Sequence, residues 1–189
     1  MSGHAFAPAP PEELRAVLDA YRVVRDASWP QLHPSMRQRA ARWPTADEAA
    51  LRAELDGYLT ETAAPGCSVR VFWKMGPKFT FAGANEAFAR DAGLPAASLL
   101  GADDFDPRLP WAAQAAKYRA DDKEVFDTGL AKLGILERQT SSSTAVVWVH
   151  VGKAPIKPAA GQVIGVLGLY ELVDDKTAQK LFFDRTAKN

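Results

Sequence analysis

Few side chains in this sequence have both the type and the spacing that chemistry requires. The three histidines, His4, His33 and His150, lie in a proline-rich tail, a loop and an apolar segment. None stands three or four residues from another metal-binding side chain, as zinc ligands on one element usually do. No metal site is therefore predicted, and His150 is interpreted as a packed or interface histidine.

The single cysteine provides no nucleophile either. Cys67 has no neighbouring base that would generate a thiolate, so it is interpreted as a small residue at the edge of a strand. One cysteine also excludes an internal disulfide, which fits a reducing cytoplasm.

Three acids in the segment "DDFDPR" suggest a calcium loop, but the pattern is incomplete. Such a loop needs a glycine at its sixth position and a closing glutamate, and this segment has neither. Asp103, Asp104 and Asp106 are instead expected to tie the loop through hydrogen bonds to backbone groups. Since no acid can be assigned to a predicted cavity, acid–base catalysis is not indicated, and the chain is predicted not to be an enzyme.

The composition is typical of a soluble globular protein. Of its 189 residues 47% are hydrophobic and 24% charged, and the net charge is zero, with acids and bases mixed along the chain. Nucleic-acid-binding proteins usually have a clustered basic surface, so nucleic acid is not expected as a partner. No apolar run approaches the about 18 residues of a membrane span, and the first residues lack the regions of a signal peptide. A cytoplasmic protein without membrane contact is predicted.

Residues 1–65 are predicted to be a helical segment behind a loose tail of residues 1–10, which is rich in alanine and proline. A first helix begins at Pro11, with Glu12 in its first turn, as suits the positive end of a helix. Its apolar residues fall on one face. This stripe consists of Leu14, Val17, Leu18, Tyr21 and Val24.

A second helix is predicted over residues 46–60, where Thr45 and Glu48 have the spacing of a capping box. Residues 35–42 are a candidate for a short third helix. Each helix has one apolar stripe and too little mass for a core of its own, so both must pack on another part of the chain. The second stripe consists of Leu51, Leu55, Tyr58 and Leu59.

Residues 66–175 change in composition to strands. The predicted order is two strands, a helix capped by Asn85, an irregular loop, a longer helix ending at Gly129, and three strands. The last two strands form a hairpin over residues 146–172. Helices gathered on one face of an antiparallel sheet make an α+β fold. Residues 176–189 are predicted to be a tail or a short helix.

Six short motifs in this region, taken in order, resemble the PAS domain, a small sensory fold of signalling proteins. They are "F-x-x-A-N-E-A-F-A-R-x-A-G" at 81–93, "L-L-G-x-D-D-F-D" at 99–106, "W-x-x-x-A-A-x-Y-R-x-D-D" at 111–122, the glutamate of "ILERQ", "W-x-x-x-x-K-x-P" at 148–155 and "G-x-V-I-G-V-L-G" at 161–168. Where the family usually has an Asp-Gly turn, this chain has "TSSSTA". The resemblance implies a five-stranded antiparallel sheet over residues 66–175, preceded by the N-terminal helical segment.

A PAS domain encloses its ligand, when it has one, between the helices and the inner face of the sheet. The family pattern places Val147, Val149, Val151, Val71, Trp73, Val163, Gly165 and Leu167 on the inner face. It places Phe72, Trp148, His150, Ile164, Val166 and Tyr170 on the outer face. The expected lining of the cavity is Trp73, Phe88, Trp111, Tyr118, Val149, Val151 and Leu167.

The resemblance also bears on cofactors. Haem-binding PAS domains generally offer a histidine from the long helix, and residues 111–129 contain none. Photosensors that bond flavin to cysteine carry it in the irregular segment, which reads "GADDFDP" here. Haem and a covalent flavin are therefore not expected, whereas a non-covalent flavin stays open.

The predicted function is that of a cytoplasmic sensory module that binds a small apolar or aromatic ligand in its core. The alternatives are a ligand-free dimerisation or adaptor module with a packed core, and a redox sensor with a non-covalent flavin. Signalling is expected through a homodimer and a signalling protein in trans. The expected contact surface comprises Leu14, Leu18, Tyr21, Trp148 and Tyr170, with the helix at 46–60 or its dimer mate lying across Trp148.

Overall fold

The computed structural model describes residues 3–33, 47–63, 69–140 and 142–187. Cys67, Thr45 and the candidate helix at 35–42 lie outside these ranges. The N-terminal part contains β1 (Ala5–Phe6), α1 (Pro11–Ser28) and α3 (Glu48–Ala63). The remainder contains β2 (Arg70–Met75), β3 (Thr80–Ala84), α4 (Glu86–Ala92), α5 (Ala96–Leu99), the 3-10 turn η1 (Ala112–Gln114), α6 (Ala115–Thr128), β4 (Lys132–Thr140), β5 (Val146–Ile156), β6 (Gly165–Val173) and α7 (Asp175–Thr186).

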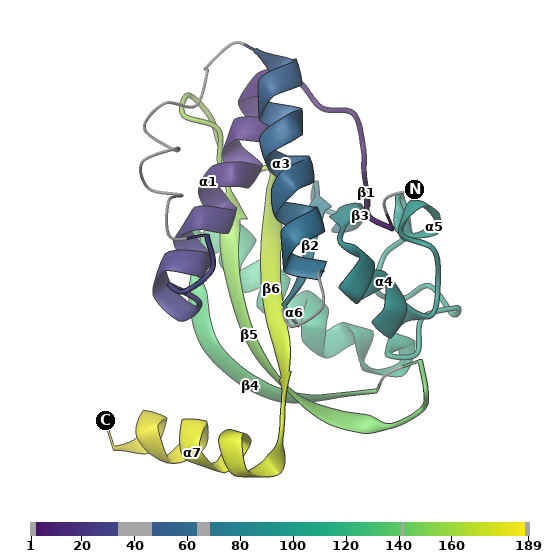
Figure 1. Cartoon of the computed structure of the whole chain (residues 1–189), viewed down its shortest axis with the longest axis vertical. Coiled ribbons are helices and arrows are strands. Elements are labelled where there is room, and N and C mark those ends of the chain that lie inside the picture. Colours follow the sequence, from purple (N-terminus) through teal and green to yellow (C-terminus); the bar gives the residue numbers. More distant parts are fainter. Residues whose placement is uncertain (1–2, 34–46, 64–68, 141, 188–189) are drawn as a thin grey trace.

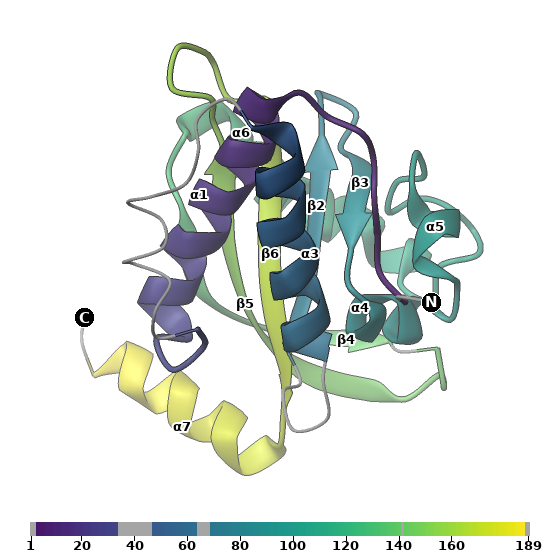
Figure 2. The ribbon, with the colours of Figure 1, turned by 45° about the horizontal axis from the view of Figure 1, so that its top comes forward.

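The described strands form one antiparallel sheet of six strands in the order β1-β3-β2-β6-β5-β4 (Figures 1 and 2). The predicted α+β class is confirmed, and the sheet has one strand more than expected. The extra strand is β1, which comes from the segment predicted to be a loose tail. It pairs with the edge of β3, and Phe6 packs against Trp73 with ring centroids 6.0 Å apart.

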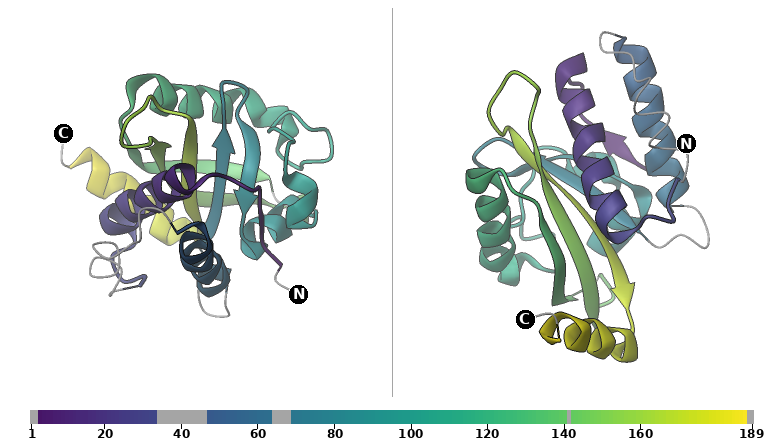
Figure 3. Two further views of the ribbon diagram at one scale, coloured as in Figure 1. Left: turned by 90° about the horizontal axis from the view of Figure 1, so that it is seen from above. Right: turned by 90° about the vertical axis from the view of Figure 1, so that its left-hand side faces the viewer.

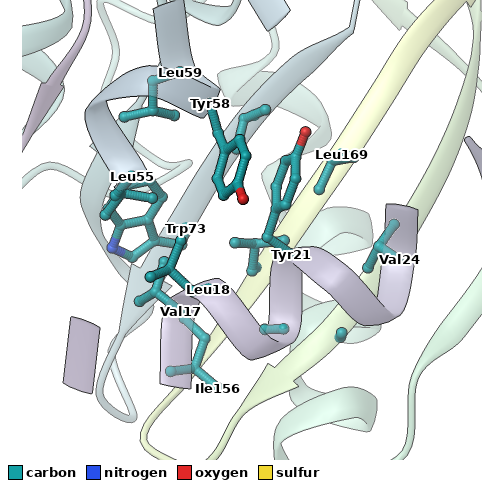
Figure 4. Packing of buried hydrophobic residues seen from close by; sticks show 14 of the residues in the cluster. Val17, Leu18, Tyr21, Val24, Leu55, Tyr58, Leu59, Trp73, Ile156 and Leu169 are labelled. Atoms are coloured by element: carbon teal, nitrogen blue, oxygen red, sulfur yellow. The ribbon is translucent and has the colours of Figure 1, made fainter. Parts of the chain in front are cut away.

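Helices cover both faces of the sheet (Figure 3). Helices α4, α5 and α6 lie on the face that we call the inner face, and α1 and α3 lie on the opposite, outer face. The apolar stripes of α1 and α3 meet the sheet there and form one core with it (Figure 4). The sheet residues of this outer core are Val71, Trp73, Ala154, Ile156, Leu167 and Leu169.

This arrangement corrects the predicted face of two strands. On β5 the prediction holds, since Val149 and Val151 belong to the core on the inner face. On β2 and β6 it is wrong, because Trp73 and Leu167 belong to the outer core. Apolar residues occupy both faces of β2 and β6 because helices cover both faces, so hydrophobicity could not indicate the register, and a shift of one residue exchanges the faces.

The predicted contact surface is also corrected. Leu14, Leu18 and Tyr21 are at most 1% exposed, because the chain's own sheet covers them. Tyr170 is buried on the inner face. Trp148 is half-buried near the start of β5. The guanidinium of Arg138 lies over its ring at 5.2 Å, in place of the helix α3 that was predicted to cover it.

The chain continues past β6 into α7, which stands away from the N-terminal helices (Figure 1). Asp174 caps this helix by accepting a hydrogen bond from the backbone N–H of Thr177 at 2.6 Å. Phe182 and Phe183 of α7 are 56% and 66% exposed. Among the described residues no helix is long and apolar enough to cross a membrane.

Candidate ligand-binding site in the core

A cavity of about 30 Å³ lies between the inner face of the sheet and helices α4 and α6. One water molecule needs about 10–15 Å³ measured in this way, so the cavity has room for about two or three. One side of it is aromatic and the other is charged or polar. Its lining consists of Phe72, Lys74, Phe81, Phe88, Asp104, Trp111, Tyr118, Glu137, Gln139, Val151, Lys153 and Tyr170.

Phe88 is the centre of the aromatic side. Its ring centroid lies 5.0 Å from that of Phe72, 5.5 Å from Phe81 and 5.4 Å from Trp111. These tilted contacts are the geometry that aromatic pairs prefer. The local fold explains the position of Phe88, since α4 starts at Asn85 and Phe88 lies in its first turn, facing the sheet.

The charged side is built around Lys74 of β2, which is 2% exposed. Its ammonium donates hydrogen bonds to Asp104 and, at 2.6 Å, to Asp122 Oδ2. Lys153 of β5 donates to the other oxygen of Asp122 at 2.7 Å. Trp111 Nε1 donates to Asp104 Oδ1 at 3.1 Å. We call Lys74, Lys153, Asp104 and Asp122 the buried ion cluster; two positive and two negative charges make it neutral.

Mutual attraction keeps the ion cluster charged despite its burial. Burial by itself would lower the pKa of Lys74, but Asp104 and Asp122 outweigh it and raise that pKa to about 12. Burial by itself would raise the pKa of Asp122, but Lys74 and Lys153 outweigh it and lower that pKa to about 2. The cluster ties α6 and the loop before it to β2 and β5.

Tyr118 and Glu137 complete the polar side. Burial, followed by the negative charges of Glu137 and Asp104, raises the pKa of Tyr118 well above its ordinary value. The hydroxyl therefore stays protonated at neutral pH, and it donates to Gln114 Oε1 at 2.8 Å. Glu137 Oε2 lies 3.2 Å from Lys117 Nζ, in an ion pair whose angle does not satisfy a hydrogen bond.

A second buried network closes the far end of the cavity. The hydroxyl of Tyr170 donates to Asp91 Oδ2 at 2.7 Å and accepts from Gln139 Nε2 at 3.2 Å. Arg70 holds the same carboxylate with two nitrogens, at 2.8 and 3.2 Å. Burial, followed by the charge of Asp91, raises the pKa of Tyr170 well above its ordinary value.

The structure brings together part of the predicted lining. Phe88, Trp111, Tyr118 and Val151 line the cavity, and Val149 is buried in the same inner core. Trp73 and Leu167 are corrected to the outer face, for the reason of register given above.

The expectation that no acid reaches the cavity is wrong, since Asp104 and Glu137 line it. Sequence reasoning also missed Lys74 and Lys153. The sequence did mark three of these residues, because Asp104, Glu137 and Lys153 belong to the six motifs that resemble the PAS domain. Lys74 carried no such signal. Of the loop acids, Asp103 and Asp106 accept hydrogen bonds from backbone N–H groups two residues onward, as expected.

The histidines lie away from the cavity. The ring of His150 packs against Trp29 at 5.2 Å, and its Nδ1 lies 3.5 Å from Glu171 Oε1. His4 Nε2 lies 2.6 Å from Asp56 Oδ1. Within the described ranges no group of three or more histidine, cysteine, aspartate and glutamate side chains could hold a metal ion.

Comparison with solved structures identifies the fold. No protein-family model and no curated protein matches the chain. A Light-Oxygen-Voltage domain solved with a flavin analogue matches 72% of this chain and 96% of its own, at 14% identity and a TM-score of 0.54. An RNA-binding Light-Oxygen-Voltage receptor matches 72% of this chain and 38% of its own, at 24% identity and a TM-score of 0.52. The VqmA dimer of Vibrio cholerae matches 56% of this chain and 47% of its own, at 24% identity and a TM-score of 0.50.

These likenesses show a PAS-type fold, since Light-Oxygen-Voltage domains are a subfamily of PAS domains. The match spans less than half the length of the receptor and of VqmA. They also correct the exclusion of nucleic acid as a partner, because the receptor binds RNA and the VqmA structure concerns target DNA.

Proposed function

We propose that this chain is a sensory module of PAS type that binds a small, flat ligand with polar groups in its core cavity. The observation that carries the proposal is the composition of that cavity. Phe72, Phe81 and Phe88 offer ring faces to it, and Lys153 and Glu137 offer opposite charges. Binding sites for small molecules typically combine an apolar lining with a few convergent polar groups.

The buried ion cluster supports this proposal on energetic grounds. Replacing a buried ion pair by well-packed apolar residues is often neutral or stabilising, so charges in a core are not explained by stability alone. Lys74, Asp104 and Lys153 line the cavity and are each at most 3% exposed. A ligand that exchanges hydrogen bonds with such groups would bind with high specificity, because an unsuitable ligand leaves them unpaired.

The size of the cavity restricts the ligand. A cavity that binds benzene measures about 150 Å³, so even one aromatic ring requires the side chains around this cavity of about 30 Å³ to move. A flavin needs a pocket of at least about 300 Å³, which disfavours the redox-sensor alternative. The nearly filled core favours the other alternative, a ligand-free adaptor, as the second candidate.

Native mass spectrometry of the freshly purified protein tests the proposal directly. We expect an added small mass that disappears on unfolding. Thermal shift measurements with DPO, the ligand of a phage VqmA structure that is 20% identical, and with flavin mononucleotide give two defined probes. No bound mass, together with no shift for a set of single-ring heterocycles, would favour the ligand-free adaptor.

The homodimer, the signalling partner in trans and the cytoplasmic location remain parts of the proposal. Since the predicted stripe on α1 is buried, we place the contact between two copies at α7. Its exposed Phe182 and Phe183 border a groove of about 1130 Å³ beside β4 and β5. A two-fold contact would let each copy supply both the phenylalanines and the groove. Sedimentation of the double variant Phe182→Ser/Phe183→Ser should then show a monomer where the unchanged chain shows a dimer.

A further inference from the structure

The two edges of the sheet differ in how they are covered. At one edge β1 pairs with β3 and hides its backbone groups. At the other edge β4 is the last strand, and no described strand lies beyond it. Helix α6 runs past this open edge on the inner face (Figure 3).

A surface depression of about 590 Å³ lies at this place. It is lined from α6 and the turn before it by Ala113, Gln114, Ala116 and Lys117, and from the sheet by Leu136, Glu137, Arg138 and Trp148. Glu137 also lines the core cavity, so one side chain forms part of both walls.

Two contacts separate the depression from the cavity. The exposed Lys117 pairs with the buried Glu137 at 3.2 Å, and the exposed Gln114 accepts a hydrogen bond from the buried Tyr118 at 2.8 Å. Each contact thus joins a residue of the depression to a residue of the cavity.

We propose that these two contacts form a gate through which ligands reach the core cavity between α6 and β4. The inference rests on the proposed function, whose site it completes with an entrance. The side chain of Lys117 is 54% exposed and that of Glu137 is 4% exposed. One partner of each contact, Lys117 or Gln114, can exchange it for water by swinging outward, whereas neither Lys74 nor Asp122 can, since both are at most 2% exposed. Opening here therefore costs less than separating Lys74 from Asp122.

The charge around the mouth sets a preference among ligands. Lys117 and Arg138 stand on opposite sides of the depression, and the half-buried ring of Trp148 lies beneath the guanidinium of Arg138 at 5.2 Å. Glu137 lines the same depression and pairs with Lys117, so these three side chains leave one net positive charge beside the ring, which favours flat ligands that carry negative charge.

The gate can be tested with a cysteine placed behind it. In a Cys67→Ser background, Val151→Cys places a thiol on the cavity wall, and mass spectrometry follows its reaction with methyl methanethiosulfonate. We expect Lys117→Ala and Gln114→Ala each to speed the reaction about two- to fivefold, the effect of losing one exposed polar contact. Ala113→Trp, which fills the depression, should slow it.

Lys123→Ala is the matched control, because it removes an exposed ion pair with Asp127 on the same helix, away from the depression. Equal rates in all variants, or a rate equal to that of global unfolding, would overturn the gate. Gln139→Cys is a second reporter if Val151→Cys does not fold. Since labelling needs no natural ligand, faster labelling together with no bound mass and no thermal shift for the probes would count against the proposed function and leave the gate standing.

Discussion

The side-chain amide of Asn85 donates a hydrogen bond to the hydroxyl of Thr62 at 3.1 Å, and so joins the last turn of α3 to the first turn of α4. The same amide donates to Val69 O at 2.9 Å. Its oxygen accepts from the backbone N–H groups of Phe88, at 3.0 Å, and Val71, at 3.1 Å. One fully buried side chain therefore links the outer helices, the sheet and the helix that carries Phe88 into the cavity.

Asn85→Ala removes all four of these hydrogen bonds and leaves buried backbone groups unpaired. We expect it to lower the free energy of unfolding by about 2–4 kcal/mol, as loss of a helix cap adds to unsatisfied polar groups. Thr62→Val, which loses the link to Asn85 and keeps the shape, should cost about 1 kcal/mol. Urea denaturation measures both; equal losses would show that the cap and the strand contacts of Asn85 contribute nothing.

The buried ion cluster makes the free energy of unfolding depend on pH in the acid range. Because the pKa of Asp122 falls from 3.8 to about 2 on folding, its contribution is present above about pH 4 and is lost as the pH falls through about 2. In Lys74→Met the carboxylate loses one of its two cations, so its pKa in the folded state rises. The midpoint of acid unfolding should therefore move to higher pH, as followed by circular dichroism.

Lys74→Met should also be costly at neutral pH, by about 3–5 kcal/mol, since it leaves a buried carboxylate short of a partner. Lys153→Met is the comparison, because Asp122 then keeps Lys74. A smaller loss is expected for it. If Lys153→Met proves as costly as Lys74→Met, the bond from Lys74 to Asp104 adds nothing.

Replacing either of two glycines by alanine tests the packing around it, and the two replacements should change the stability in opposite directions. A methyl group at Gly83 of β3 would overlap the ring of Trp73, so Gly83→Ala should destabilise the fold by about 1–3 kcal/mol. At Gly57 of α3 nothing lies within 4 Å, so Gly57→Ala should stabilise it by about 0.5–1 kcal/mol through helix propensity. A Gly83→Ala variant as stable as the unchanged chain would argue against the position of the Trp73 ring beside β3.

The ends of helices were predicted well, because single residues signal them. The face of the sheet on which a side chain lies was predicted poorly where no such signal exists. The cap at Asn85 and the helix end at Gly129 are confirmed, because each depends on the conformation of one residue. The family pattern placed Val149 and Val151 of β5 correctly on the inner face, whereas it placed Trp73 of β2 and Leu167 of β6 on the wrong face, because these two strands are apolar on both faces.

The polar half of the site was missed for a different reason. Asp122 and Lys74 are 48 positions apart, and a lysine in a strand is normally expected to face solvent. Its burial depends on two carboxylates that only the folded chain brings to it. The two-residue strand β1 was missed as well, because it is ordered by pairing with β3 and not by its own composition.

The N-terminal helices are expected to be an obligatory layer of this fold. They bury Val71, Trp73, Ile156 and Leu169 on the outer face, which would otherwise form a continuous apolar patch (Figure 4). Exposing such a patch favours association, since burying it gains about 25 cal/mol per Å². Deletion of residues 1–62 should therefore give an insoluble or self-associating protein. Deletion of residues 1–9 alone removes β1 and should leave a folded chain of slightly lower stability. Sedimentation and soluble yield compare the two; a soluble, monomeric chain after the longer deletion would contradict the role of the helices as a cover.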